Sequence, residues 1–170
     1  IVKTIKLIVA SEFSKMPGNF AFLVLGSEGR MEQTLKTDQD NAIVYSDELS
    51  TDDLVLLEAF SVKLIDSLVE IGFPSCPGGI MAKNAPWRKS LIDWGDTVKG
   101  WVSVPTPDNI LNYSMFSDLR TVFGDPDLEK ALKQRVVNVI TKNPVFLAHM
   151  ANNILRFKPP LNFLGSVAFE

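Results

Sequence analysis

A buried strand that leads into a polar loop, and out of it into a second strand, constrains the fold of this chain most. Residues 20–25 form an unbroken apolar run, which predicts a buried β-strand. Residues 42–45 predict a second, shorter strand. The loop between them begins with a Gly-Ser pair at 26–27 and ends with Asp38 and Asp40. Two carboxylates at the entrance to a buried strand need a partner, because burying a lone charge is costly.

Hydrophobic periodicity and turn residues predict the remaining elements, most of which are helices. In the first half we expect a helix over 1–16, the two strands, and a long helix that Ser50, Thr51 and Asp52 cap and Gly72 ends. A loop over 73–86 with a short strand around Ile80 and Met81 follows, and then a helix over 87–104 interrupted by Gly95. The rest predicts a helical turn over 108–112, a third strand over 113–122, a helix that Asp125 caps, and a helix over 144–157. This order favours an α/β or α+β fold with a small mixed central sheet, flanking helices and a helical C-terminal part.

The bulk composition suits one compact domain and narrows the class of partner. The chain has 170 residues, 46% of them hydrophobic, and a formal net charge of -3. A general nucleic-acid binder usually carries a basic stripe, so this composition argues against nucleic acid as a partner. An acidic chain can still bind phosphates through a metal ion, since the bound cation reverses the local sign of charge.

Cysteine usage and hydropathy favour the cytoplasm and argue against a membrane span. Cys76 is the only cysteine, so neither an internal disulfide nor a cysteine zinc cluster can form. No apolar run reaches about 18 residues, and the N-terminus does not read as a signal peptide. The chain starts at Ile1, within a helical pattern and without Met, from which we expect a fragment of a longer protein.

The polar loop carries the residue types of a metal-bridged phosphate site. At strand spacing, Asp38 and Asp40 point to the same side, where they repel unless they are protonated or bridged by a cation. Mg²⁺ commonly resolves such repulsion, held by one or two carboxylates and a substrate phosphate. Gly26 permits close approach of the backbone, and the Ser27 hydroxyl and nearby amides can bind phosphate oxygens. Arg30 adds a guanidinium fork that suits a phosphate.

Each half of this pattern also has a plain structural interpretation. A Gly-Ser pair after a strand is more often a simple turn, and an Asp-x-Asp in a loop is usually a pair of solvated acids. The combination of strand, Gly-Ser, Asp-x-Asp and strand is more specific than either half. It is neither a P-loop nor a dinucleotide-binding fingerprint, because it lacks both GxxxxGK[ST] and GxGxxG.

The stretch "LGSEGRMEQTLKTDQDNAIVY" resembles the signature of the polymerase-beta-like nucleotidyltransferase superfamily. Within that superfamily it is similar to the nucleotidyltransferase domain of bacterial signalling proteins, which often carry CBS and cyclic-nucleotide-binding modules. It is also similar to the uridylyltransferase of the nitrogen regulatory PII protein and to the glutamine synthetase adenylyltransferase. The likeness continues in "GFPSCPGGIMAKNAPWRKSL", "MFSDLRTVFGD" and "KPPLNFLGSV", so it covers most of the chain from Phe20 onward.

The resemblance implies a role for each matched residue. Gly26 and Ser27 would hold a nucleoside triphosphate. Asp38 and Asp40 would coordinate two Mg²⁺ ions, for which Mn²⁺ can substitute. The third carboxylate of the superfamily lies on a later strand, and Asp118 in "SDLR" is the best candidate for it.

The neighbours of these residues leave alternatives open. On the predicted third strand Arg120 would face the same way as Asp118, where it could neutralise that carboxylate or reach a phosphate. Asp118 and Arg120 could equally form a structural pair at the end of a strand. Gln39 and Asn41 depart from the superfamily, whose members usually have apolar residues at these places, and the polar pair could alter nucleotide or metal contacts.

By resemblance, the chain is a Mg²⁺-dependent nucleotidyltransferase that moves a nucleoside monophosphate from a triphosphate to an acceptor hydroxyl and releases pyrophosphate. The acceptor could be a side chain of a regulatory protein, an antibiotic or a metabolite, and further regulatory domains would belong to the full-length chain. The nucleotidyltransferase domain would span 1–124, with a helical extension over 125–170. The alternative is a non-catalytic nucleotide-sensing or interaction domain of a multidomain signalling protein.

Three further features have two interpretations each. Trp87, Trp94 and Trp101 form either a base-stacking platform or, as the helical spacing favours, a buried stripe. The segment "CPGG" at 76–79 is either a second loop over the nucleotide or a rigid turn. His149 is a lone histidine within a predicted helix, for which a core or surface role is favoured.

Overall fold

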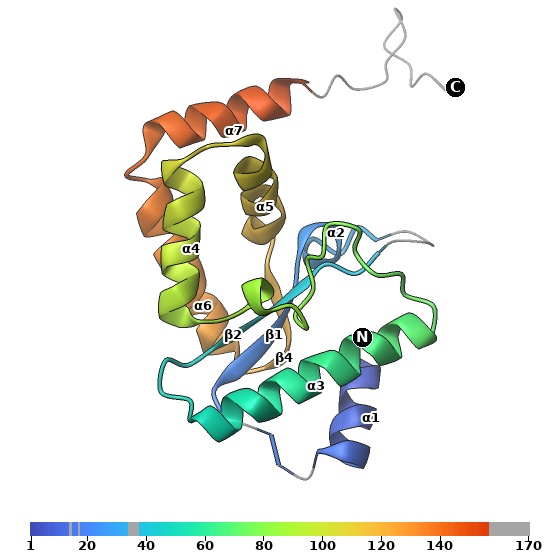
Figure 1. Ribbon diagram of the computed structural model, residues 1–170. Coiled ribbons are helices and arrows are strands. Elements are labelled where there is room, and N and C mark those ends of the chain that lie inside the picture. Colours follow the sequence, from blue (N-terminus) through green and yellow to red (C-terminus); the bar gives the residue numbers. More distant parts are fainter. Residues whose placement is uncertain (14, 17, 34–37, 157–170) are drawn as a thin grey trace, which may run out of the picture.

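A mixed four-stranded sheet with the order β3-β2-β1-β4 lies at the centre of the fold (Figure 1). The computed structural model describes residues 1–13, 15–16, 18–33 and 38–156. β1 pairs antiparallel with both of its neighbours, and β2 pairs parallel with β3. The strands are β1 Phe20–Val24, β2 Asn41–Tyr45, β3 Arg88–Ser90 and β4 Arg120–Gly124.

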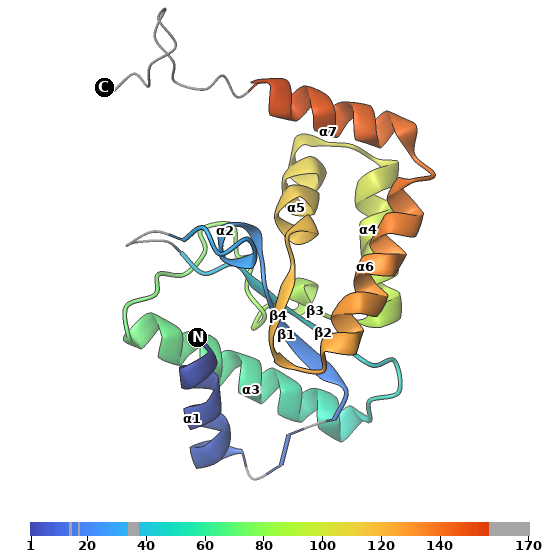
Figure 2. The ribbon, with the colours of Figure 1, turned by 180° about the vertical axis from the view of Figure 1, so that it is seen from behind.

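Helices cover both faces of this sheet, which explains why β1 is apolar throughout and why β2 is mostly buried. α1 Val2–Glu12 and α3 Thr51–Glu70 pack together on one face, where Phe60 contacts Phe20 of β1 edge-to-face (Figures 1 and 2). α4 Leu91–Ser103 and α6 Pro126–Ile140 cover the other face. Every residue of β1 is at most 3% exposed, because both faces of the strand are covered, and its sequence therefore does not alternate between apolar and polar residues.

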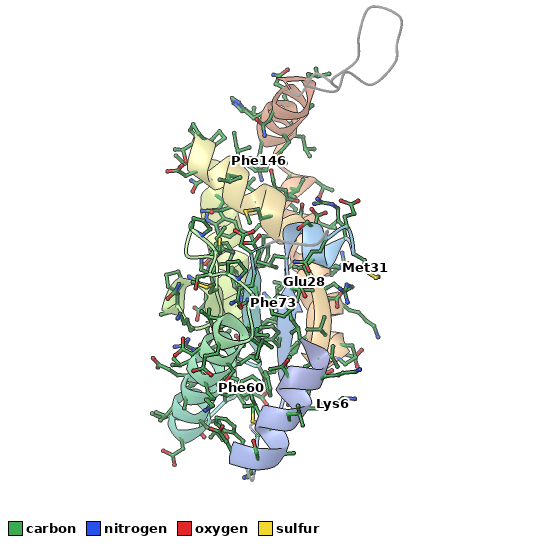
Figure 3. All side chains as sticks on the ribbon, turned by 90° about the vertical axis from the view of Figure 1, so that its right-hand side faces the viewer. Lys6, Glu28, Met31, Phe60, Phe73 and Phe146 are labelled. Atoms are coloured by element: carbon green, nitrogen blue, oxygen red, sulfur yellow. The ribbon has the colours of Figure 1, made fainter. Side chains whose placement is uncertain are left out.

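The helices beyond the sheet form a second layer at one end of the molecule. α5 Pro107–Ser117 packs on α4, and α7 Pro144–Arg156 lies across the ends of these helices (Figures 1 and 2). Phe146 of α7 is 1% exposed and meets Tyr113 of α5 edge-to-face (Figure 3). The short elements are α2 Gly26–Gly29 and the 3₁₀ turn Ala85–Trp87.

The predicted starts of two helices are confirmed by the capping interactions that the sequence indicates. The Ser50 hydroxyl accepts a hydrogen bond from the Asp53 amide and completes a capping box at the start of α3. The Asp125 carboxylate accepts from the Asp127 amide at the start of α6. The apolar side of α6 lies in the same hydrophobic core as the sheet. The expected domain boundary at residue 124 stays a prediction.

The predicted third strand over 113–122 is wrong over most of its length. Thr106 caps α5 and Pro107 occupies its first turn, so the helix runs on through Ser117. The actual strand, β4, begins only at Arg120. Asp118 therefore lies in the turn between α5 and β4, and it does not share a strand face with Arg120.

Two further expectations fail nearby. The predicted helix over 87–104 begins only at Leu91, because Ser90 caps it, and residues 88–90 form β3 instead. No strand forms around Ile80 and Met81, although the Ile80 carbonyl accepts a hydrogen bond from the Asn41 amide. The glycines before Ile80 favour a turn here, and Gly79 has a positive φ of 68°.

Candidate active site

The turn after β1 brings the backbone beside the second carboxylate of the Asp-x-Asp motif. The Leu25 amide donates to the Asp40 carbonyl at 2.9 Å, which extends the β1–β2 ladder to the first residue of the turn. Gly26 then adopts a φ of +51°, a conformation that glycine tolerates best. A Cβ on Gly26 would lie 3.9 Å from Asp40 Oδ2. The Gly-Ser turn and the Asp40 side chain therefore form two walls of one site.

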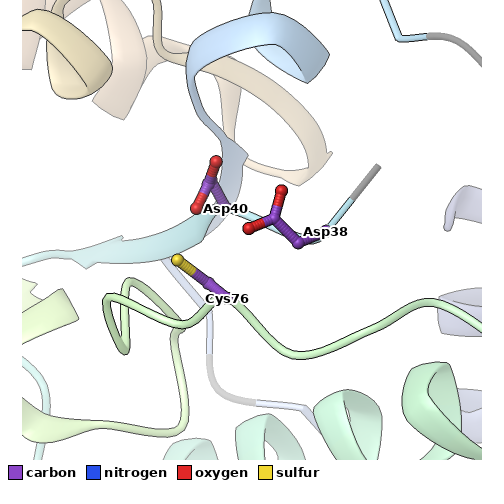
Figure 4. Close-up of side chains that lie close together, drawn as sticks. All are labelled: Asp38, Asp40 and Cys76. Atoms are coloured by element: carbon purple, nitrogen blue, oxygen red, sulfur yellow. The ribbon is translucent and has the colours of Figure 1, made fainter. Parts of the chain in front are cut away.

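Two aspartates and the only cysteine converge at the entrance to β2. One ligand atom each from Asp38, Asp40 and Cys76 lies within 4.8 Å of the others (Figure 4). The predicted alternation is confirmed, since Asp38 and Asp40 face the same cluster while Gln39 between them is fully buried. The third member comes from the loop after α3, in the segment that the sequence left open as either a second loop over the nucleotide or a rigid turn.

The polar residues that depart from the superfamily pattern anchor this loop. Gln39 Nε2 donates to the Phe73 carbonyl at 3.3 Å, and the Gln39 amide donates to the Pro74 carbonyl at 3.2 Å. Asn41 Oδ1 accepts from the Ala82 amide at 2.8 Å, and Asn41 Nδ2 donates to Gln39 Oε1. Both side chains are buried, so they satisfy backbone groups that would otherwise be orphaned. Their structural role is to hold the Cys76 loop against β2.

The negative charge and the burial of the cluster would favour a bound cation. Burial raises the pKa of Asp40, and the nearby charge of Asp38 adds to that shift. Burial and the Asp40 carboxylate also raise the pKa of the Cys76 thiol. Asp40 Oδ1 is buried and has no hydrogen-bond partner among the described residues. A buried carboxylate oxygen without a donor is an unusual cost for a protein to retain.

Glu28 is a further carboxylate of the site that the sequence analysis missed. It lies in α2, directly after the Gly-Ser pair (Figure 3). Burial raises its pKa, with attraction to Arg120 opposing the shift and repulsion from Asp40 adding to it. The run "GSEGR" contains this acid, but no sequence signal distinguishes it from a solvated one.

Asp118 and Arg120 hold the Gly-Ser turn from the other side. Arg120 donates through Nε to the Gly29 carbonyl at 3.1 Å and through Nη2 to the Glu28 carbonyl at 2.9 Å. Arg30 forms an ion pair with Asp118 and a second one with Glu32. The Asp118 side chain is 28% exposed and, in the described part of the chain, is not a member of the Asp38 cluster.

We call these contacts the clamp: Gly29 and Arg30 on the turn after β1, with Asp118 and Arg120 on the segment that joins α5 to β4. The two backbones of the clamp also approach each other closely. A Cβ on Gly29 would lie 1.8 Å from the Asp118 carbonyl oxygen, a distance that no side chain can occupy. Gly29 is therefore required for packing, not for backbone conformation. The pairing of Asp118 with Arg120, which the sequence left open as one alternative, is not formed, and Asp118 pairs with Arg30 instead.

The other features are distributed away from this cluster. Trp87, Trp94 and Trp101 pack against one another, as the structural interpretation of the stripe predicts. Burial is confirmed for Trp87 and Trp94, whereas Trp101 is half-buried and Trp87 lies in the 3₁₀ turn before α4. His149 is exposed and lines a cavity of about 530 Å³ between α5 and α7. The helices of the described segments include none that is long and apolar enough to cross a membrane.

The comparison with known families decides how this cluster is understood. Residues 1–108 match the family model described as "Putative nucleotidyltransferase DUF294". The chain belongs to this nucleotidyltransferase family. The matched region contains the Gly-Ser turn, both aspartates and Cys76, and it ends in the first turn of α5. No curated protein matches the chain.

Proposed function

We propose that this domain transfers a nucleoside monophosphate from a nucleoside triphosphate to an acceptor hydroxyl and releases pyrophosphate. One observation carries the proposal. The Asp38 and Asp40 carboxylates converge beside the Gly26 turn, at the end of a buried strand, in a chain of a nucleotidyltransferase family. Phosphoryl chemistry of this kind needs positioning and charge neutralisation more than covalent catalysis. The residues of the site would supply the positioning, and cations held by the two carboxylates would supply the neutralisation.

The cluster fits a divalent cation on two grounds. Asp40 Oδ1 is buried without a partner among the described residues, and two carboxylates at this distance repel unless one is protonated or a cation bridges them. Carboxylate oxygens are the ligands that Mg²⁺ and Mn²⁺ prefer. When bound, such ions neutralise phosphate charge and stabilise the attacking and leaving oxygens. We expect Asp38 and Asp40 to hold two of them.

The residues of the turn would bind the triphosphate. Gly26 leaves its site-facing side free of a Cβ, and the Ser27 hydroxyl and turn amides are suitable donors to phosphate oxygens. Arg30 and Arg120 already donate to protein groups. We therefore infer that these arginines position the turn, in contrast to the phosphate contact expected from the sequence.

The acceptor and the setting follow from the resemblance alone. The likeness to uridylyl- and adenylyltransferases of signalling pathways supports a protein side chain as the acceptor, and it supports regulatory domains elsewhere in a longer chain.

The test is an assay of transfer with matched variants. The chain is incubated with Mg²⁺ and each labelled nucleoside triphosphate, and released pyrophosphate and labelled protein are measured. Asp38→Asn and Asp40→Asn should abolish turnover, whereas Asp52→Asn, an exposed acid at the start of α3, should not. Binding of the triphosphate is measured in parallel, because the acceptor has not been identified. If the unaltered chain shows no turnover and no Mg²⁺-dependent binding of any triphosphate, the proposal is overturned.

One observation favours a second candidate function, nucleotide sensing without transfer. The carboxylate expected to complete the catalytic set, Asp118, is engaged by Arg30 instead. A site with only two carboxylates can still bind a metal–nucleotide complex. Mg²⁺-dependent binding that requires Asp40, without pyrophosphate release for any acceptor tried, is the result that this alternative predicts.

A further inference from the structure

We infer that Cys76 is the third protein ligand of the metal site, so that the site is a mixed oxygen–sulfur centre. This inference rests on the proposed metal site of Asp38 and Asp40. The Cys76 sulfur lies within 4.8 Å of a carboxylate oxygen of each aspartate (Figure 4). In the described part of the chain, these three residues are the group of potential ligands whose atoms approach one another this closely.

The loop that carries Cys76 is held in place by the strand that carries the aspartates. Gln39 forms a parallel bridge with Ser75, the residue before Cys76. On the other side of the cysteine, the Gly79 amide donates to the Cys76 carbonyl at 3.0 Å and closes a turn. Further along the loop, the Ala82 amide donates a hydrogen bond to Asn41 Oδ1 at 2.8 Å. The distance between sulfur and carboxylates is thus set by hydrogen bonds on both sides of Cys76, as a preorganised site requires.

The chemistry of the three groups is that of a site completed by a cation. Cys76 is 7% exposed and faces Asp40, whose Oδ1 has no partner among the described residues. When a metal binds, the thiol proton leaves to solvent and the sulfur donates a lone pair to the ion. The bound metal would then offset negative charge of the two carboxylates and of the thiolate.

A sulfur ligand changes which metal the site selects. Carboxylates alone suit Mg²⁺ and Mn²⁺, whereas a thiolate favours softer ions such as Zn²⁺ and Co²⁺. We therefore expect the chain to bind Co²⁺ and Zn²⁺ more tightly than Mg²⁺ in the absence of nucleotide. The preference should depend on Cys76, which is the only cysteine in the sequence.

The experiment is a titration of the whole chain with Co²⁺, followed by near-ultraviolet absorption and by equilibrium dialysis. Thiolate-bound Co²⁺ gives an intense sulfur-to-metal charge-transfer band, which in this chain can arise only at Cys76. We expect the band in the unaltered chain and in the Asp52→Asn control. Cys76→Ser should lose the band and bind Co²⁺ more weakly than the unaltered chain, with Mg²⁺ binding changed far less.

Each other outcome overturns the inference. Co²⁺ that binds by dialysis without the band, or no Co²⁺ binding at all, rules out a sulfur ligand, and this result does not depend on the folding of any variant. Equal Co²⁺ affinity in Cys76→Ser, with a native circular dichroism spectrum, does the same. In all three cases Mg²⁺-dependent nucleotide binding that requires Asp40 would leave the proposed function standing, so the two failures are distinguishable.

Discussion

Asp40 carries a cost to the fold that its proposed role as a metal ligand would explain. Its Oδ1 atom is buried and unpartnered among the described residues, and burial raises its pKa. Asp40→Asn should therefore raise the free energy of unfolding of the metal-free chain by up to about 1 kcal/mol. The same change should abolish Mg²⁺-dependent nucleotide binding. Thermal unfolding and binding of a labelled triphosphate measure the two effects. Asp52→Asn should change neither, and a variant that loses stability together with binding would contradict this account.

The raised pKa of Asp40 also predicts how metal affinity depends on pH. The metal binds only the ionised carboxylate, and a raised pKa means that the proton competes more strongly. Apparent Mn²⁺ affinity should therefore fall as the pH is lowered, beginning at a higher pH than for an aspartate with an ordinary pKa. Titration calorimetry at a series of pH values tests this. An affinity that stays flat until the ordinary aspartate range would contradict metal binding by an Asp40 with a raised pKa.

Two glycines allow a matched test of the clamp at the residue scale. Gly29→Ala places a Cβ against the Asp118 carbonyl and should lower the free energy of unfolding by about 1–3 kcal/mol. Gly100→Ala, in α4, meets no atom within 4 Å and should raise it by about 0.5–1 kcal/mol. Chemical denaturation compares the two. Equal effects of the same sign would show that Gly29 is not packed as described.

At the scale of elements, the turn after β1 depends on a segment about ninety residues later in the chain. Arg120→Gln removes charged hydrogen bonds to the Glu28 and Gly29 carbonyls. It should weaken nucleotide binding and lower the free energy of unfolding by about 1.5–3 kcal/mol. Arg120→Lys should recover part of the binding. Arg135→Gln, on the exposed side of α6, is the control, and a nucleotide affinity that Arg120→Gln leaves unchanged would exclude a positioning role.

Which elements could be predicted follows from how each is buried. β1 lies between two strands and two helical layers, so its sequence is apolar at every position and its prediction is confirmed. β3 is a short edge strand of sequence "RKS", which carries no apolar signal. In α5 the buried residues Tyr113 and Phe116 stand at helical spacing, but we expected only a helical turn over 108–112, whereas Pro107 is the first residue of a helix that runs on through Ser117.

The site was predictable only where its residues are neighbours in sequence. Strand alternation was enough to place Asp38 and Asp40 on one side. Cys76 reaches them through a loop that bridges to β2, a tertiary pairing that no local pattern encodes. Gln39 and Asn41 looked like departures from a nucleotide-binding motif, and their hydrogen bonds show that they support that loop.

At the scale of the whole molecule, the tryptophans join the sheet to the helical layer. Trp94 is fully buried, donates through Nε1 to the Ile43 carbonyl at 2.9 Å, and stacks on Phe116. Trp94→Phe should lower the free energy of unfolding by about 1–3 kcal/mol, because it leaves a buried acceptor without its donor. Nucleotide affinity, measured below the unfolding transition, should be unchanged. Weaker binding in a folded Trp94→Phe chain would revive the base-stacking interpretation.

The proposed metal and triphosphate would meet at one place, between the Gly-Ser turn and the Asp-x-Asp carboxylates. A crystal of the chain with Mn²⁺ and a non-hydrolysable nucleoside triphosphate tests this most directly, by anomalous scattering from the metal. We predict a Mn²⁺ peak bound by Asp38 and Asp40, with the triphosphate against Gly26 and Ser27. An ordered triphosphate elsewhere on the molecule, with no Mn²⁺ peak at these carboxylates, would contradict the account.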